Sequence, residues 1–512
     1  MYKFLPLLLL LVVALTSCER DELTTNDAPV EKLLSRDQID QTLYQEIERN
    51  GTYHWSVASN ELLWSAAMQS DSIFAIGYQP AGFENIETEM HRIDLNAADW
   101  QAAQEKILQL ILDGEREIGA AATTREDLLP MGEPEVLPSM AVHFTNPATV
   151  GRLRAMGEIR YLEAMGYELP ALNQPTIGRS DSGCGSSPDY NLNPADYTTI
   201  APNVKQSWHH ASSNLSQAWQ SSTGDNVTIA IIDTGVSDDQ ENLGSQFNAG
   251  YSSGRTVNRA STLYTGRWWW RKLSSPDDGC GHGTSMSGLA TAPRGTDGNS
   301  VGVAYNADLL SIRAVEDVII SSSDEKNGVK NALILAGNNP NVRVISMSIG
   351  SPFYSGTVAD GIYYAYNSGK FITAAAGTSL TWTTWYGVIF PATMSQTVAV
   401  TGVRDGSTME KCNTCHEGSE VDFVMVMQRA ANSDRTTLSL ALDTDQPNYV
   451  GGSSAATASV AGIAALVFSN YPSATRQQVY DALRDNGNFY PNRDSDFGWG
   501  VIDAASAVAD PL

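Results

Sequence analysis

The C-terminal part of the chain predicts an α/β fold built on a parallel β-sheet with helices on both faces. Short runs of Val, Ile and Ala alternate there with longer segments of helical spacing, and strands that are separated by helices form parallel sheets. Ligands bind such sheets at the carboxyl ends of the strands. The expected strands are 227–233, 307–314, 342–348, 371–376 and 397–403, and the expected helices are 326–337, 357–368 and 454–468.

The N-terminal part predicts a separate domain, mixed α+β and largely helical. A chain of 512 residues is too long for one core. More than half of its net charge of −26 falls on residues 19–180, which indicates a domain boundary. So acidic a chain is not expected to bind nucleic acid. The spacing of apolar residues predicts helices over 31–50, 60–76, 97–112 and 147–156, and strands over 140–144 and 158–163.

The first residues have the features of a secretory signal. Lys3 precedes an apolar run, 5–15, that is too short to span a membrane. The sequence LTSC ends this region and resembles a bacterial lipobox, which implies a lipid on Cys18 and tethering of an exported protein to a membrane. Acidic residues follow, and they favour the outer membrane or the cell surface. An ordinary signal peptide with an incidental cysteine is the alternative.

The expected domains follow from these signals. Residues 1–18 form the signal peptide with its lipobox cysteine, 19–180 the acidic N-terminal domain, 181–200 a linker and 201–512 the α/β domain. The stretch 178–193 is polar and rich in Gly and Ser, and proteases cut exposed segments of this kind. The linker is therefore expected to contain a processing site.

Three short stretches carry the residue types that nucleophilic catalysis needs. They are Asp233 in IIDTGV, His282 in GHGTS and Ser454 in GGSSAATASVAG. A serine needs a base to remove its proton, and the imidazole of that base needs a carboxylate to orient it. Alone, these residues read as a strand-end cap, a loop histidine and a helix N-cap. Together they predict a nucleophilic triad.

From about residue 208 onwards, the chain resembles the subtilisin-like serine proteases, or subtilases. The sequence VTIAIIDTGV resembles the family's aspartate strand, GHGTSMSGLATAP its histidine helix, VISMSIG its substrate-binding strand and TAAAGT its oxyanion segment, in the family's order. The resemblance implies a subtilisin-like fold and a serine endopeptidase that hydrolyses protein or peptide substrates through an acyl-enzyme.

The resemblance also implies roles for individual residues. Ser454 is the nucleophile, His282 the general base and then acid, and Asp233 orients His282. The oxyanion is held by the backbone N–H of Ser454 and by Thr378, which stands where the family has asparagine. The walls of the substrate-binding pocket are Ser348, Ile349 and Gly350 on one side and Ala375, Ala376 and Gly377 on the other.

Two expectations about accessory groups and partners accompany these roles. No cofactor is required; calcium is possible without an evident ligand set, because Asn242 stands where relatives often have a calcium-binding aspartate. Residues 19–180 are expected to act as a propeptide that assists folding and inhibits until cut. A threonine hydroxyl has less reach than an asparagine amide, so a catalytically silent subtilase fold that binds other proteins is the alternative. A processing protease with one dedicated partner is another.

The cysteines predict disulfides in an oxidising compartment. A bond between Cys184 and Cys280 is one possible pairing. The sequence CNTCH, from Cys412 to His416, fits c-type haem attachment, but a local disulfide is the expectation and a metal site a further alternative.

Two groups of large side chains remain. The tryptophans 268–270, with Trp382 and Trp385, either line a substrate subsite or, as we expect, pack under their loops. His209 and His210 are expected to lie outside the catalytic apparatus.

Overall fold

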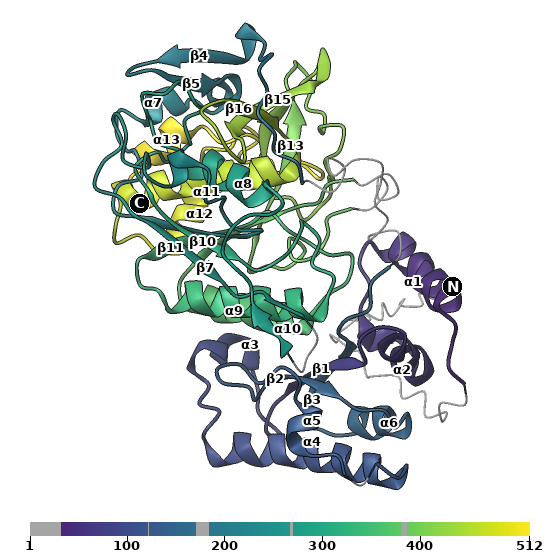
Figure 1. Cartoon of the computed structure of the whole chain (residues 1–512). Helices are drawn as coiled ribbons and strands as arrows, with labels where there is room; N and C mark the ends of the chain where they lie inside the picture. Colours follow the sequence, from purple (N-terminus) through teal and green to yellow (C-terminus); the bar gives the residue numbers. More distant parts are fainter. Residues whose placement is uncertain (1–31, 121, 170–183, 267–269, 380–386) are drawn as a thin grey trace, which may run out of the picture.

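Two β-sheets with separate hydrophobic cores organise the chain (Figure 1). The computed structural model describes residues 32–120, 122–169, 184–266, 270–379 and 387–512. The larger sheet has the strand order β16-β15-β14-β13-β12-β11-β6-β10-β7, and the smaller has the order β2-β1-β3.

The larger sheet is parallel over its centre and antiparallel at one edge. All five predicted strands are present in it, and their apolar runs have little alternation because both faces of the sheet are covered. The parallel strands are β6 (Thr228–Asp233), β7 (Val257–Ser261), β10 (Asp308–Arg313), β11 (Val342–Met347), β12 (Phe371–Ala375), β13 (Val398–Arg404) and β14 (Phe423–Arg429). The antiparallel strands are β15 (Asn432–Leu440) and β16 (Pro447–Val450).

Alternate residues of β6 show that different helices cover the two faces. Ile229 and Ile231 share a core with α8 (His282–Thr291) and α11 (Gly452–Asn470), whereas Ala230 and Ile232 share one with α9 (Ser323–Asn338) and α10 (Gly356–Asn367). The three predicted helices of this domain are thus confirmed. The helix α11 is long and apolar enough to cross a membrane. However, 89% of its apolar 18-residue stretch is buried inside the protein, so α11 is a core helix.

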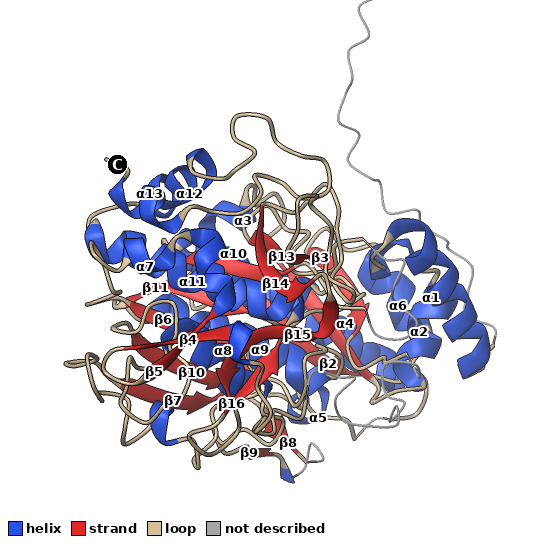
Figure 2. Ribbon diagram, turned by 90° about the horizontal axis from the view of Figure 1, so that it is seen from above, coloured by secondary structure: helices blue, strands red, loops and turns tan. Residues whose placement is uncertain are grey.

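The smaller sheet is antiparallel. In Figure 2, its helices α1, α2 and α6 lie to one side of the larger sheet. The helices predicted over 31–50, 97–112 and 147–156 are confirmed as α1, α4 and α6. The bounds are α1 (Arg36–Asn50), α2 (Asn60–Met68), α4 (Ala98–Glu117), α6 (Ala148–Arg154), β1 (Ile73–Tyr78), β2 (Ser139–His143) and β3 (Ile159–Ala164).

One expectation for this region is wrong. The helix predicted over 60–76 ends at Met68, and Ile73–Tyr78 forms the central strand of the sheet. The chain reverses at Ser72, which has a φ of 61°. The strand is buried at every residue, and a short apolar run without alternation cannot be distinguished from a helix by periodicity.

Shorter elements complete the fold. They are α3 (Ile86–Glu89), α5 (Arg125–Leu128), α7 (Leu215–Ala218), α12 (Arg476–Asp485), α13 (Ala504–Ala509), β4 (Tyr197–Ile200), β5 (Val204–Ser207), β8 (Tyr264–Thr265) and β9 (Lys272–Leu273).

The smaller sheet lies below α9 and α10 in Figure 1, and it contacts the first turns of both helices. The Arg160 guanidinium on β3 forms an ion pair with Asp360 on α10, and both side chains are largely buried. The Glu163 carboxylate accepts a hydrogen bond of 2.9 Å from the backbone N–H of Gly356, in the first turn of α10. The Lys326 ammonium on α9 donates to the Met165 carbonyl over 2.5 Å. A buried ion pair and the hydrogen bonds of buried ionisable side chains therefore join the two sides of this interface.

Candidate active site

Asp233 ends β6 and His282 begins α8, and the fold brings their side chains into contact. The His282 Nδ1 lies 2.8 Å from the Asp233 Oδ1, and both side chains are buried. Burial lowers the pKa of His282, but the charge of Asp233 and its hydrogen bond outweigh burial and hold that pKa above its usual value. With Nδ1 donating to the carboxylate, the other ring nitrogen is left to exchange a proton with a substrate or nucleophile.

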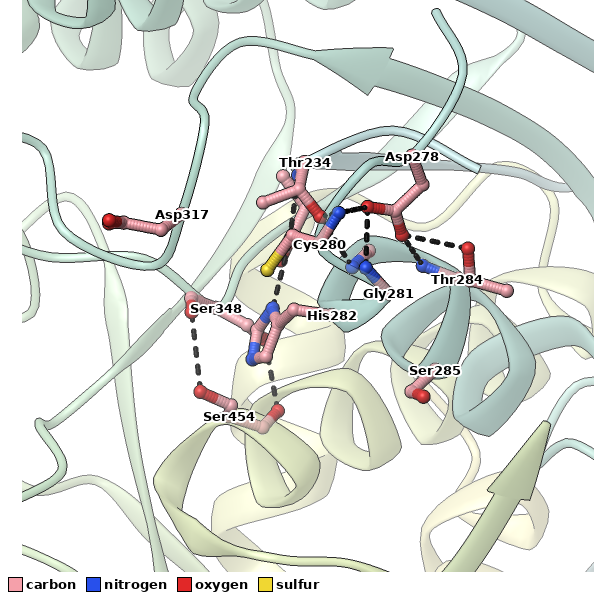
Figure 3. Close-up of polar contacts among 12 residues, drawn as sticks. Thr234, Asp278, Cys280, Gly281, His282, Thr284, Ser285, Asp317, Ser348 and Ser454 are labelled. Atoms are coloured by element: carbon pink, nitrogen blue, oxygen red, sulfur yellow. Dashed lines mark hydrogen bonds and ion pairs between the residues drawn. The ribbon is translucent and has the colours of Figure 1, made fainter. Parts of the chain in front are cut away.

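Asp278 lies beside the start of the helix that carries His282 (Figure 3). Its buried carboxylate accepts five hydrogen bonds that fix the turn leading into His282; the donors are the backbone N–H groups of Cys280, Gly281 and Thr284 and the hydroxyls of Thr234 and Thr284. Gly281 has a φ of 91°, which favours glycine. The sequence reasoning missed Asp278; an acidic residue shortly before a Gly-His helix start was the available signal.

Ser454 lies in the first turn of α11, in the same cavity as His282. Its hydroxyl donates to the Ser348 carbonyl over 3.2 Å, and the Ser348 hydroxyl donates to the Ser454 carbonyl over 2.9 Å (Figure 3). Ser454 is half-buried, although its neighbours Ser453 and Ala455 are fully buried. The helix start exposes unpaired N–H groups and a partial positive charge beside this hydroxyl.

Thr378 faces the same helix start. Its Oγ1 lies 3.0 Å from the Oγ of Ser453, the residue before Ser454, and Thr378 lines the cavity. A β-bridge joins Thr378 to Cys415, and the backbone N–H of Ser379 donates to the Thr414 carbonyl over 2.6 Å. A strand-like pairing therefore holds the segment that carries Thr378.

The cavity has a volume of about 600 Å³, and most of the predicted pocket residues line it. Ser348, Ile349 and Gly350 line it after β11, and Ala375 and Gly377 line it at the end of β12. Ala376 is fully buried and does not line it. The sequence reasoning missed other lining residues, namely Val318, Ile319, Ile389, Asn413, Thr414 and His416.

The expected local disulfide and the possible Cys184–Cys280 pairing are both present. Cys184 is bonded to Cys280 and Cys412 to Cys415. The thiols of the CNTCH sequence are thus consumed by a local disulfide, which leaves none for haem attachment or for a metal. The first bond ties the segment that begins at Cys184 to the turn before His282, and the N–H of Gly185 donates to the Cys280 carbonyl over 2.9 Å.

Among the described residues, no cluster of carboxylates marks a calcium site. No group of three or more His, Cys, Asp or Glu side chains within the described ranges could hold a metal ion. Asn242 is buried, and neither polar atom of its side chain has a hydrogen-bond partner in the described part of the chain; one amide oxygen is not a ligand set.

Other predicted residues lie away from the cavity or outside the described residues. His209 and His210 are fully buried in a short helix, Trp208–Ser213, and do not line the cavity. Trp270 is 64% exposed. Cys18, Trp268, Trp269, Trp382 and Trp385 lie outside the described residues.

Comparison with known proteins agrees with this geometry. The Subtilase family profile matches residues 224–500. Subtilisin E of Bacillus subtilis is 29% identical over 289 residues, which cover 56% of this chain and 67% of subtilisin E. Thermitase of Thermoactinomyces vulgaris is 30% identical over 279 residues, which cover 54% of this chain and 88% of thermitase.

A solved structure extends the likeness to most of the chain. Fervidolysin from Fervidobacterium pennivorans, a keratinolytic enzyme related to subtilisin, has a TM-score of 0.57 and 18% identity; the match covers 86% of this chain and 61% of that chain. At this identity the likeness concerns the fold alone. The chain has the subtilisin-like α/β fold and belongs to the subtilase family.

Proposed function

We propose that the protein is a serine endopeptidase that cleaves peptide bonds through Ser454, His282 and Asp233. Membership of the subtilase family supports serine peptidase chemistry. The observation that carries the residue assignment is the 2.8 Å contact between His282 and Asp233, with Ser454 on a helix start in the same cavity.

The proposed reaction begins when the Ser454 hydroxyl leaves the Ser348 carbonyl and turns to His282. The oxygen attacks the substrate carbonyl while His282 takes its proton, and Asp233 stabilises the imidazolium. His282 then protonates the leaving amine, and water hydrolyses the acyl-enzyme by the reverse sequence. The backbone N–H of Ser454 and the hydroxyl of Thr378 stabilise the oxyanion.

The N-terminal region is proposed to act as the enzyme's own propeptide, cut within 178–193. The buried ion pair of Arg160 with Asp360 supports tight docking of this region before the cut. Lipidation at Cys18 would hold the exported precursor at the outer membrane or the cell surface. A Ser454→Ala protein with the same cleaved band as wild type would contradict self-processing.

Fluorophosphonate labelling tests the nucleophile. Wild type is expected to be labelled and Ser454→Ala unlabelled. Ser469→Ala, at the far end of the same helix, is the matched control and is expected to be labelled like wild type. Two observations favour the alternative of a silent binding protein: the Ser454 hydroxyl rests on Ser348, and a threonine replaces the oxyanion asparagine. Folded, cleaved wild type that takes no label would support that alternative.

A further inference from the structure

The two walls of the pocket each contain a glycine that faces a side chain. Gly350 follows β11 and Gly377 follows β12, two neighbouring parallel strands. A P1 side chain, the one that precedes the cleaved bond, would enter between these walls under the proposed function. The groups in contact with the two glycines therefore decide how large a P1 side chain the enzyme accepts.

The Ile389 side chain lies where a side chain at position 350 would be. The segment that carries Ile389 is bound to both walls, since the Ile389 N–H donates to the Ala376 carbonyl over 3.0 Å and the Ser351 N–H donates to the Phe390 carbonyl over 2.8 Å. A Cβ added at Gly350 would lie 2.7 Å from the Ile389 Cδ1, well inside van der Waals contact. Ile389 also lines the cavity, so its branched side chain is part of the surface that meets the substrate.

His416 occupies the face of Gly377. Its N–H donates to the Gly377 carbonyl over 3.0 Å, and a Cβ added at Gly377 would collide with its ring at Nδ1. The residue is 2% exposed, and its Nδ1 lies 3.1 Å from the Gly387 carbonyl. The Cys412–Cys415 disulfide immediately precedes this residue, so the ring sits on a turn that is closed covalently.

We propose that Ile389 and His416 fill the P1 pocket and restrict the enzyme to substrates with glycine or alanine at P1. This inference rests on the proposed function. Both side chains are held through their backbones, so a large P1 group has to force one of them aside. Forcing extra atoms into a packed site is unfavourable, and one methylene more or fewer in a hydrophobic pocket already changes kcat/KM by about 10–200-fold.

The test compares two peptide substrates, succinyl-Ala-Ala-Pro-Ala and succinyl-Ala-Ala-Pro-Phe p-nitroanilides. The full chain is first incubated until samples withdrawn from it reach a constant level of fluorophosphonate labelling, and the unlabelled remainder is then assayed. Wild type is expected to prefer the alanine substrate by at least about 10-fold. Ile389→Ala is expected to raise kcat/KM for the phenylalanine substrate by about 10–200-fold. Leu335→Ala, an exposed residue on α9, is the matched control and is expected to keep the wild-type ratio.

The outcomes separate this inference from the proposed function. Labelled wild type that prefers phenylalanine overturns the inference and leaves the proposed function standing. Wild type that takes no label and cleaves neither substrate overturns both. If Ile389→Ala does not fold, Ile389→Val replaces it, and an unchanged substrate ratio in a labelled variant counts against Ile389 as the barrier.

Discussion

Replacing Thr378 by valine is expected to lower kcat by about 10²–10³ with little change in KM. Valine keeps the shape of threonine and removes the hydroxyl. The Thr378 Oγ1 lies 3.0 Å from the Ser453 Oγ, and either atom can donate in that contact. When Ser453 donates, the Thr378 proton is free to meet the oxyanion that forms next to Ser454.

The magnitude follows from the loss of one oxyanion donor, which costs about 2.7–4 kcal/mol of transition-state stabilisation. The substrate in its ground state has no full negative charge at this position, so KM reports little of the loss. Thr378→Ser keeps the hydroxyl and is expected to retain kcat within about tenfold of wild type.

The assay measures kcat and KM with the alanine p-nitroanilide, with active enzyme counted by fluorophosphonate labelling. A Thr378→Val enzyme with kcat within about threefold of wild type would refute the reasoning, because the backbone N–H groups of the helix start would then suffice.

Three other predictions concern charge. Asp233→Asn is expected to lower kcat by about 10⁴ with an unchanged circular dichroism spectrum; a loss below about tenfold would exclude the orienting role. The pKa of His282 is held above its usual value, and the base must be neutral, so kcat/KM should fall with acidification at a pH above about 6.5; an inflection below about 6 would contradict this. Burial raises the pKa of Glu163 to about 7, above the value of about 4.3 for a free carboxyl. Docking of the N-terminal domain should therefore weaken as pH rises through about 7. The test uses a Ser454→Ala protein that has been cut before Cys184. Gel filtration at about pH 5 and about pH 8 measures how much of the N-terminal domain stays bound. The same pH dependence in a Glu163→Gln variant would count against the role of Glu163.

The central strands of the larger sheet could be predicted from the sequence, because each is a continuous apolar run between helices. Ile73–Tyr78 is also such a run, but it comes shortly after a helix. The apolar residues of both segments fit one helical spacing, so the predicted helix was too long. The motifs around Asp233 and His282 indicated that these side chains meet. Asp278 was missed although a local signal was present, since most of its hydrogen bonds come from the turn that directly follows it. Ile389 and His416 could not be found from the sequence, because their importance lies in contacts with Gly350 and Gly377, which are far from them in the chain.

Because of the Cys184–Cys280 bond, the position of the proposed cut decides whether the two fragments separate. The window 178–193 spans Cys184. A cut before Cys184 separates the catalytic domain from the fragment that we propose to carry the lipid, whereas a cut after it leaves the two fragments covalently joined through Cys280. In the second case, the proposed lipid on Cys18 would keep the mature enzyme at the membrane after activation. Its release then depends on the reducing power of the surroundings, and a non-reducing gel of the processed protein distinguishes the two cases.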